Sequence, residues 1–455
     1  MKKKIEEYLN SNLDNIVSDL KGLMQINSVC SEPMPGMPYG EGSAKALEYI
    51  KQLSERLGLK TRTFQNYAVT ADYGTPDKEV ALGILAHVDV VPEGDGWTYP
   101  CFDLTIDNGR AYGRGAIDDK GPAVASLYAV KALNDLGIEL KKNVRYIFGG
   151  GEEIGCNDIE YYQEQEALPD MLLTPDGEFP IVNAEKGIVQ VFAQKDIASS
   201  KLKELKCLGA VNAVPAKATA RITGFLMDDV LEAIEKMTYP TEFKLQQDNG
   251  DIVITSIGKA AHGSRPHLGM NALTALLGLL NALDIEIATE LCTLFAYDEY
   301  NGKSFGVDFS DEVSGELSLA LTVCDLENNH IKIGLDSRFP ISKTYDDVSK
   351  PIIAKLEAIG FEIYDSHGME AHYVDENSEF ISAVKRAYKE IIGEEAKCIC
   401  ETGATYVHNT PSGVAFGPEM SGENNGMHSA NESIALDRLV LLARVYAQAI
   451  IEICG

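Results

Sequence analysis

The sequence lacks several features that would place the protein outside the cytoplasm or in a membrane. No apolar stretch reaches the ~20 residues that a membrane-spanning helix needs. The lysines at positions 2–4 are not followed by an apolar segment, so we expect no signal peptide. The nine cysteines are scattered, and none shows the Cys-x-x-Cys spacing of a zinc or redox motif. We therefore interpret them as buried thiols of a cytoplasmic protein.

Basic residues are also scarce. The chain has 40 Lys and Arg against 69 Asp and Glu, which gives a net charge of −29 at pH 7. Nucleic acids and anionic membranes are bound by clusters of Lys and Arg, so we expect neither as a partner. The remaining composition, 45% hydrophobic and 24% charged, is that of an ordinary globular protein. At 455 residues the chain is too long for one core, which predicts two or more domains.

Hydrophobic periodicity predicts an α/β catalytic domain in two parts, residues 1–184 and 378–455. Here helices alternate with strands, a pattern typical of a sheet that helices cover on both faces. The expected helices span 4–23, 43–57, 122–136, 158–166, 378–392 and 434–454. The expected strands span 59–65, 80–86, 144–148, 170–174, 398–400 and 414–416.

The pattern changes between residues 185 and 377. Strands are expected at 251–257, 330–339 and 361–364, and helices at 270–283 and 345–359. Two β-α-β half-patterns in one insert predict an α+β lid domain with two lobes.

Histidine and carboxylate residues recur where strands of the predicted sheet end. His87 closes the first buried strand, Glu152 and Glu153 follow the strand at 144–148, and Asp176 follows the strand at 170–174. In α/β sheets, ligands gather at the carboxyl ends of strands. Imidazole nitrogens and carboxylate oxygens suit a divalent metal when thiolates are absent.

Each motif also has a structural interpretation. His87-Val88-Asp89 could be a surface or capping pair, and Glu152-Glu153 a solvated loop. Asp118 and Asp119 could cap the helix that begins at Pro122. Their occurrence together, in order and at strand ends, favours a metal site.

Three runs of sequence carry a family resemblance. The segments 85–92 (LAHVDVVP), 112–122 (YGRGAIDDKGP) and 150–155 (GGEEIG) resemble the dinuclear zinc exopeptidases and deacylases. This family includes the carnosinases, acetylornithine deacetylase, succinyl-diaminopimelate desuccinylase and the peptidase V-type dipeptidases, which the chain resembles most. The resemblance implies a zinc-exopeptidase-like catalytic domain, a mixed sheet between helices, with an inserted lid.

The resemblance also implies the metal ligands. Asp118 would bridge two divalent ions, most simply zinc, with manganese or cobalt as alternatives. One ion would be completed by His87 and Asp176, the other by Glu153 and His428. Glu152 would be the general base, and Asp89 would orient His87. The Asp118–Asp119 peptide resembles the family's non-proline cis bond.

A second group of residues in or beside the insert resembles the family's lid residues. His262 would stabilise the oxyanion, although it could instead be a capping histidine. Asn212 would contact the same intermediate. Arg338 would bind the substrate's C-terminal carboxylate, unless it forms only a structural salt bridge. Gly403 would bind the substrate, and it lies in a 401–408 loop (ETGATYVH) that departs from the family's glycine-rich loop.

The predicted function is that of a metal-dependent dipeptidase whose water is activated between two metals. A deacylase of N-acyl amino acids is the alternative within the enzyme class. A catalytically inactive metal- or peptide-binding protein is a further alternative, which the complete ligand set disfavours. We expect a small dipeptide as the partner and a monomer as the working form, with a homodimer as the other option.

Overall fold

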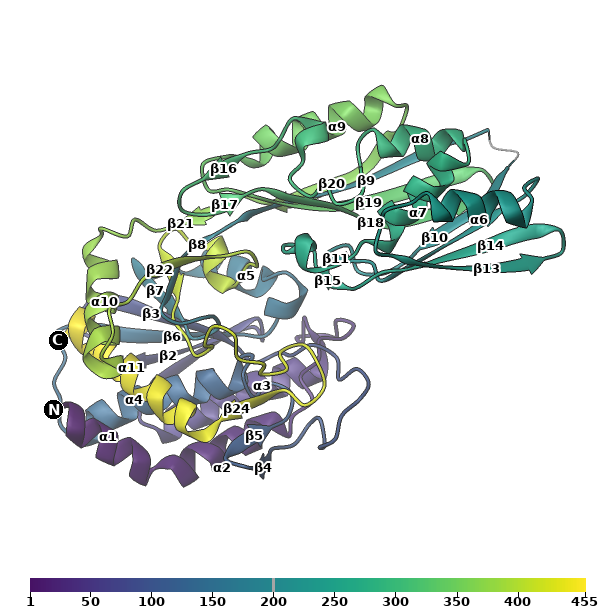
Figure 1. Ribbon diagram of the computed structural model, residues 1–455. Helices are drawn as coiled ribbons and strands as arrows, with labels where there is room; N and C mark the ends of the chain where they lie inside the picture. Colours follow the sequence, from purple (N-terminus) through teal and green to yellow (C-terminus); the bar gives the residue numbers. More distant parts are fainter. Residues whose placement is uncertain (199–200) are drawn as a thin grey trace. The chain divides into compact units, whose positions relative to one another are not determined.

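The computed structural model describes residues 1–198 and 201–455 (Figure 1). The chain forms two compact units. Unit 1 contains Met1–Ala184, Tyr373–Ile399 and Ala404–Gly455, and unit 2 contains Glu185–His372 with Cys400–Gly403. The predicted insert, 185–377, differs from unit 2 at its C-terminal side. Residues 373–377 belong to unit 1, and the short segment Cys400–Gly403 belongs to unit 2.

The sheet of unit 1 has the strand order β1-β2-β6-β3-β7-β23-β8 at its centre. Strands β3, β6, β7 and β23 are parallel to one another, and β1 and β2 are antiparallel additions. The bounds are β1 Lys60–Phe64, β2 Ala68–Tyr73, β3 Val80–His87, β6 Asn143–Gly149, β7 Met171–Thr174, β8 Ile181–Glu185 and β23 Gly413–Ala415. The predicted strand at 398–400 is β22, Cys398–Glu401, and β21 is His372–Tyr373. A small sheet joins β4 Thr105–Asp107, β5 Arg110–Tyr112 and β24 Ser433–Ala435.

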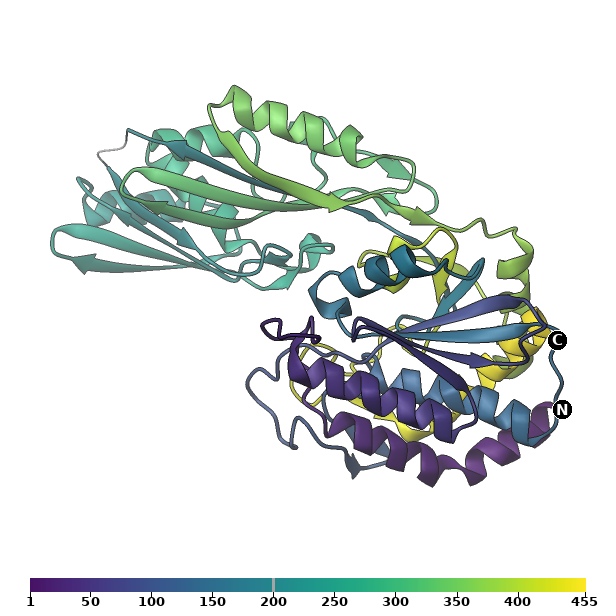
Figure 2. The ribbon, with the colours of Figure 1, turned by 180° about the vertical axis from the view of Figure 1, so that it is seen from behind.

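Helices cover both faces of this sheet (Figures 1 and 2). Alternate residues of β6 explain the two layers: Tyr146 and Phe148 enter the main core, while Ile147 enters a smaller core under α5. The helices are α1 Lys2–Ser11, α2 Leu13–Met24, α3 Gly40–Arg56, α4 Lys120–Asp135, α5 Asn157–Gln165, α10 Glu379–Ile392 and α11 Leu436–Cys454. The predicted α/β architecture is therefore confirmed.

The predicted single helix over residues 4–23 is wrong. It is divided into α1 and α2 at Asn12, whose φ of −103° and ψ of 6° leave helical geometry. The Asn12 side-chain amide donates to the carbonyl of Tyr8 at 2.9 Å. Asparagine competes for backbone groups in this way, which weakens a helix interior. The apolar period continues across the break, which is why the sequence does not reveal it.

Unit 2 is built on one antiparallel sheet of order β13-β14-β12-β10-β18-β19-β9-β20. The bounds are β9 Gly187–Asp196, β10 Leu202–Cys207, β12 Lys217–Ile222, β13 Glu242–Asp248, β14 Asp251–Ile257, β18 Ser318–Glu327, β19 His330–Phe339 and β20 Glu362–Met369. Helices α6 Met227–Glu235, α7 Ala272–Ala282, α8 Glu286–Cys292 and α9 Tyr345–Ala358 pack on one face (Figure 1). The three strands expected from the sequence, β14, β19 and β20, all lie in this one sheet.

Short elements complete the described residues. In unit 2, β11 Ala213–Val214 pairs with β15 Ala261–His262, and β16 Ser310–Asp311 with β17 Gly315–Glu316. Single 3-10 turns are η1 Glu152–Ile154, η2 Pro266–Leu268, η3 Lys303–Phe305 and η4 Tyr406–Asn409. None of the helices in the described residues is both long and apolar enough to cross a membrane.

Candidate metal centre

Three parallel strands bring candidate ligands to one edge of the unit 1 sheet. His87 is the last residue of β3, which pairs in parallel with β6 on one side and β7 on the other. Glu152 and Glu153 lie in η1 just beyond β6, and Asp176 lies two residues beyond β7. Because parallel strands end at the same edge, these side chains converge although they are far apart in sequence.

Asp118 lies between two histidines. Its Oδ1 is 2.9 Å from Nε2 of His87, and its Oδ2 is 2.8 Å from Nε2 of His428. Asp176 Oδ2 lies 3.7 Å from the same His87 nitrogen, and Glu153 Oε2 lies 3.4 Å from that of His428. The five residues therefore form two groups that share one carboxylate.

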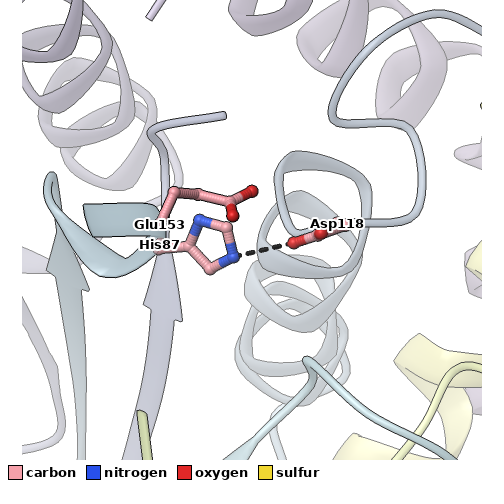
Figure 3. A group of neighbouring side chains, drawn as sticks. All are labelled: His87, Asp118 and Glu153. Carbon is pink, nitrogen blue, oxygen red and sulfur yellow. Dashed lines mark hydrogen bonds and ion pairs between the residues drawn. The ribbon is translucent and has the colours of Figure 1, made fainter. Parts of the chain in front are cut away.

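The best-formed part of the cluster is His87, Asp118 and Glu153 (Figure 3). One ligand atom from each lies within 4.8 Å of the others. Figure 3 shows the His87 ring directed at the Asp118 carboxylate, with the Glu153 carboxylate beside it. This group could hold a metal ion, and Asp118 is the member that both groups of side chains share.

The electrostatics of the cluster also fit a divalent cation. Burial and the neighbouring charge of Asp118 raise the pKa of Asp176 to about 8. Burial raises the pKa of Glu152 well above its usual range against the opposing effect of His87, and the charges of Asp176 and Glu153 add to the rise. Glu153 Oε1 is buried without a hydrogen-bond partner among the described residues. Carboxylates so crowded and incompletely paired are suited to cation binding.

Asp89 connects His87 to the turn that carries the two glutamates. Its carboxylate accepts the backbone N–H of Glu152 at 3.2 Å and that of Glu153 at 3.1 Å. Its backbone carbonyl lies 3.1 Å from His87 Nδ1. A carbonyl can only accept, so Nδ1 carries a proton, and Nε2 is the nitrogen that could bind a metal.

The glycines before Glu152 serve close packing. A Cβ at Gly149 would come within 1.9 Å of the Tyr406 hydroxyl, and one at Gly151 within 2.6 Å of the Tyr39 ring. The Gly151 N–H also donates to Asp158 at 2.7 Å. The glycines thus allow a tightly packed turn.

Sequence reasoning missed the groups that hold Asp118 in place. The carboxylate of Glu432 accepts the N–H of Ile117 at 3.0 Å and that of Asp118 at 3.3 Å, and its other oxygen pairs with Arg114 at 2.7 Å. Glu432 is 0% exposed and Arg114 2%. The available signal was their proximity in sequence to candidate ligands. Arg114 precedes Asp118 by four residues, and Glu432 follows His428 by four.

Asp119 has a related role. Its Oδ2 accepts the backbone N–H of His87 at 3.1 Å, and its peptide bond with Asp118 is cis, as the resemblance implied. Asp118 and His87 are thus held by neighbours as well as by their own strands and loops.

The remaining candidates lie in unit 2 and gather around Thr402. Arg338, on β19, is 4% exposed, and its guanidinium donates to the Thr402 carbonyl at 3.4 Å. Ser264, two residues after His262, contacts the Thr402 hydroxyl at 2.9 Å. The Gly263 N–H donates to the Asn212 carbonyl at 2.6 Å, and Gly403 follows Thr402 directly. The structure therefore brings Asn212, His262, Arg338 and the Gly403 loop together within one unit.

Arg338 does form the salt bridge that was its structural alternative. Its Nε is 2.9 Å from Asp336 Oδ2, and a terminal nitrogen is 3.2 Å from Oδ1. With the Thr402 contact, three of its five N–H groups are engaged among the described residues.

Histidines and carboxylates around a shared aspartate, with a further glutamate alongside, define the class of a metal-dependent hydrolase. Comparison with known proteins is consistent with this class. Over 456 aligned residues the chain is 33% identical to a Bacillus subtilis protein named "Putative dipeptidase YtjP", with 97% of each chain covered. Residues 83–452 match Peptidase family M20/M25/M40. The chain belongs to this family and is a peptidase, so the resemblance seen in the three sequence runs is confirmed.

Solved structures show the same fold. Human carnosine dipeptidase 1 superposes with a TM-score of 0.63 at 18% identity, covering 99% of this chain and 98% of its own. The di-peptidase Dug1p of Saccharomyces cerevisiae superposes with a TM-score of 0.61 at 16% identity, with the same coverage. Because these identities are low, the two superpositions show a shared fold only.

Proposed function

We propose that the protein is a dipeptidase that binds two divalent metal ions, with Asp118 shared between them. The position of Asp118 supports this most directly, because each of its oxygens faces a different histidine. His87 and Asp176 would complete one site, and Glu153 and His428 the other. Zinc suits these donors, as do manganese and cobalt.

Two such ions, when bound, lower the pKa of a water molecule and polarise a carbonyl. Glu152 would act as general base: it would take a proton from the attacking water and return it to the leaving amine. Its backbone N–H is fixed on Asp89, which also sets the tautomer of His87. Asp89 would thus align the base and one metal ligand together.

Unit 2 would supply the groups that recognise the substrate. His262 would donate to the oxyanion that forms when water attacks the peptide carbonyl, with Asn212 beside it. Arg338 would bind the C-terminal carboxylate, for which two N–H groups remain, and the Gly403 backbone would line the same subsite. Their gathering around Thr402 supports this assignment.

We further propose that the protein works as a cytoplasmic monomer on small dipeptides, without nucleic acid or membrane partners. The net charge of −29 opposes contact with phosphates, and the nine free cysteines suit a reducing compartment.

A hydrolysis panel tests the function. The purified chain, with its metal content measured, would be assayed on unblocked dipeptides and on N-acetyl amino acids. Turnover of dipeptides is expected, and Glu152→Gln should remove it while metal remains bound. Turnover of the N-acetyl compounds alone would replace the proposal with a deacylase.

A further inference from the structure

The ring of His262 has a defined set of neighbours at one nitrogen. The backbone N–H of Ser264 donates to its Nδ1 at 3.2 Å, and the Ser264 hydroxyl lies 2.7 Å from the same atom. A backbone N–H can only donate, so Nδ1 must present its lone pair. A neutral imidazole that accepts at Nδ1 carries its proton on Nε2.

A second hydroxyl supports this arrangement. Thr402 donates to the Ser264 oxygen at 2.9 Å, which is nearer than its other acceptor, the Glu401 carboxylate at 3.4 Å, and this leaves the Ser264 proton free to point at His262 Nδ1. Ser264 is 7% exposed. The Thr402 carbonyl at the same time accepts from Arg338 at 3.4 Å. The two hydroxyls therefore form a directed chain from the Gly403 loop to the His262 ring.

The charges around the ring favour its neutral form. Although His262 is exposed overall, desolvation lowers its pKa most, and the Arg338 charge lowers it further. Arg265 acts in the same direction, whereas Asp336 and Glu401 act against it. The hydrogen-bond donors at Nδ1 also favour the neutral ring. If Nδ1 were protonated, its N–H would point at the Ser264 N–H, and two donors cannot form a hydrogen bond.

We propose that Ser264 and Thr402 are positioning residues that hold His262 as the neutral tautomer with its proton on Nε2. This inference rests on the proposed function, in which His262 must donate a hydrogen bond to the oxyanion. In this tautomer the ring offers a donor without first taking up a proton. The geometry points to a preorganised donor rather than a general acid.

Nitrogen NMR on the zinc-loaded full chain, labelled with ¹⁵N-histidine, tests the tautomer without any measurement of activity. The His262 signals would be identified by their loss in His262→Gln. A pyridine-type Nδ1 and a pyrrole-type Nε2 are expected. His330 is an internal contrast, because its Nδ1 lies 2.7 Å from the Asp196 carboxylate, which can only accept a hydrogen bond. A pyrrole-type Nδ1 at His262, or a doubly protonated ring at pH 8, would overturn the proposal.

Kinetics test the two hydroxyls. Ser264→Ala and Thr402→Val should each lower kcat by roughly two- to tenfold, the size of one hydrogen bond, with little change in KM. In Ser264→Ala the acid limb of the kcat/KM profile should move to higher pH, since a donor that favours the neutral ring is lost. Thr402→Ser, which keeps the hydroxyl, should have the kcat and the acid limb of the unmodified protein.

Ser366→Ala is the matched control, because it removes a unit 2 hydroxyl that contacts Tyr345 instead of a histidine. An unmoved acid limb in Ser264→Ala would overturn the role of the hydroxyls. If His262→Gln has full activity, the oxyanion role fails, and the NMR spectrum still reports the tautomer independently.

Discussion

Two histidines, one in each unit, are set to opposite tautomers by the group at Nδ1. In unit 1 the carbonyl of Asp89 faces His87 Nδ1, so the proton lies there, and Nε2 would offer its lone pair to a bound metal ion. In unit 2 the N–H of Ser264 faces His262 Nδ1, so Nε2 carries the proton. The first arrangement suits a metal ligand and the second a hydrogen-bond donor. One neighbouring backbone group thus decides which chemistry each imidazole can perform.

The surroundings of the two rings differ as well. His87 is buried beside Asp118 and Asp176, whose crowded carboxylates suit a bound cation. His262 is exposed and is held by neutral hydroxyl and backbone groups. Mutation of the candidate ligands in unit 1 should therefore act through metal binding, and mutation of His262 in unit 2 through turnover.

The largest effect is expected for Asp118→Ala, which removes the carboxylate between His87 and His428. Both metal ions should be lost together, and activity with them. Metal analysis after dialysis would measure this. Two tightly held ions per chain in the variant would show that Asp118 does not bridge.

Glu152→Gln should lower kcat by ~10²–10⁴ while both metals remain bound, because a positioned base contributes about this much. Steady-state kinetics and metal analysis on the same sample separate the two effects. A loss of tenfold or less would contradict the role of Glu152 as base.

His262→Gln should lower kcat by ~10²–10³, with KM changed much less, since an oxyanion donor acts mainly in the transition state. Metal content should stay the same, which distinguishes this variant from Asp118→Ala. A raised KM at unchanged kcat would instead make His262 a ground-state contact.

Glu432→Gln should weaken metal affinity by ~10–100-fold, a range found for groups that hold metal ligands in place. It removes the charge that pairs with Arg114 and disturbs the support of the Asp118 backbone. Titration calorimetry with zinc would measure the change. Glu423→Gln is the control, because Glu423 pairs with Arg110 at 3.0 Å and contacts no ligand in the described residues. Equal affinities in both variants would exclude the positioning role.

The smallest change in activity is expected when the inactive Glu152→Gln and His262→Gln chains are mixed. In a working monomer each chain lacks one essential group, so activity should remain near zero. Assay of the mixture against each variant alone would show this. Recovered activity would mean that unit 2 of one chain serves unit 1 of another.

The position of the candidate ligands at strand ends could be predicted from sequence because of local rules. Apolar runs such as 80–86 predict buried strands, and parallel strands present their carboxyl ends at one edge. The strands β2, β9, β10, β12, β13 and β18 were not predicted, because their identity depends on pairing with neighbours distant in sequence. The break at Asn12 was missed because the apolar period continues through it.

The supporting contacts could not be predicted, since they join segments far apart in the chain. Glu432 is 314 residues from the Asp118 N–H that it accepts, and Thr402 is 138 residues from Ser264. Neither hydrophobic periodicity nor motif spacing predicts a contact between residues so far apart in sequence.

The sequence by itself determined the α/β class, the family and the residue types that can bind metal, because periodicity and short motifs encode local structure and donor chemistry. Only the tertiary structure decided that the oxygens of Asp118 face two different histidines and that Glu432 supports it. It also decided that a carbonyl faces Nδ1 of His87 whereas a backbone N–H faces Nδ1 of His262. The physical reason is that a hydrogen bond depends on the position of both partners, which folding alone brings within reach.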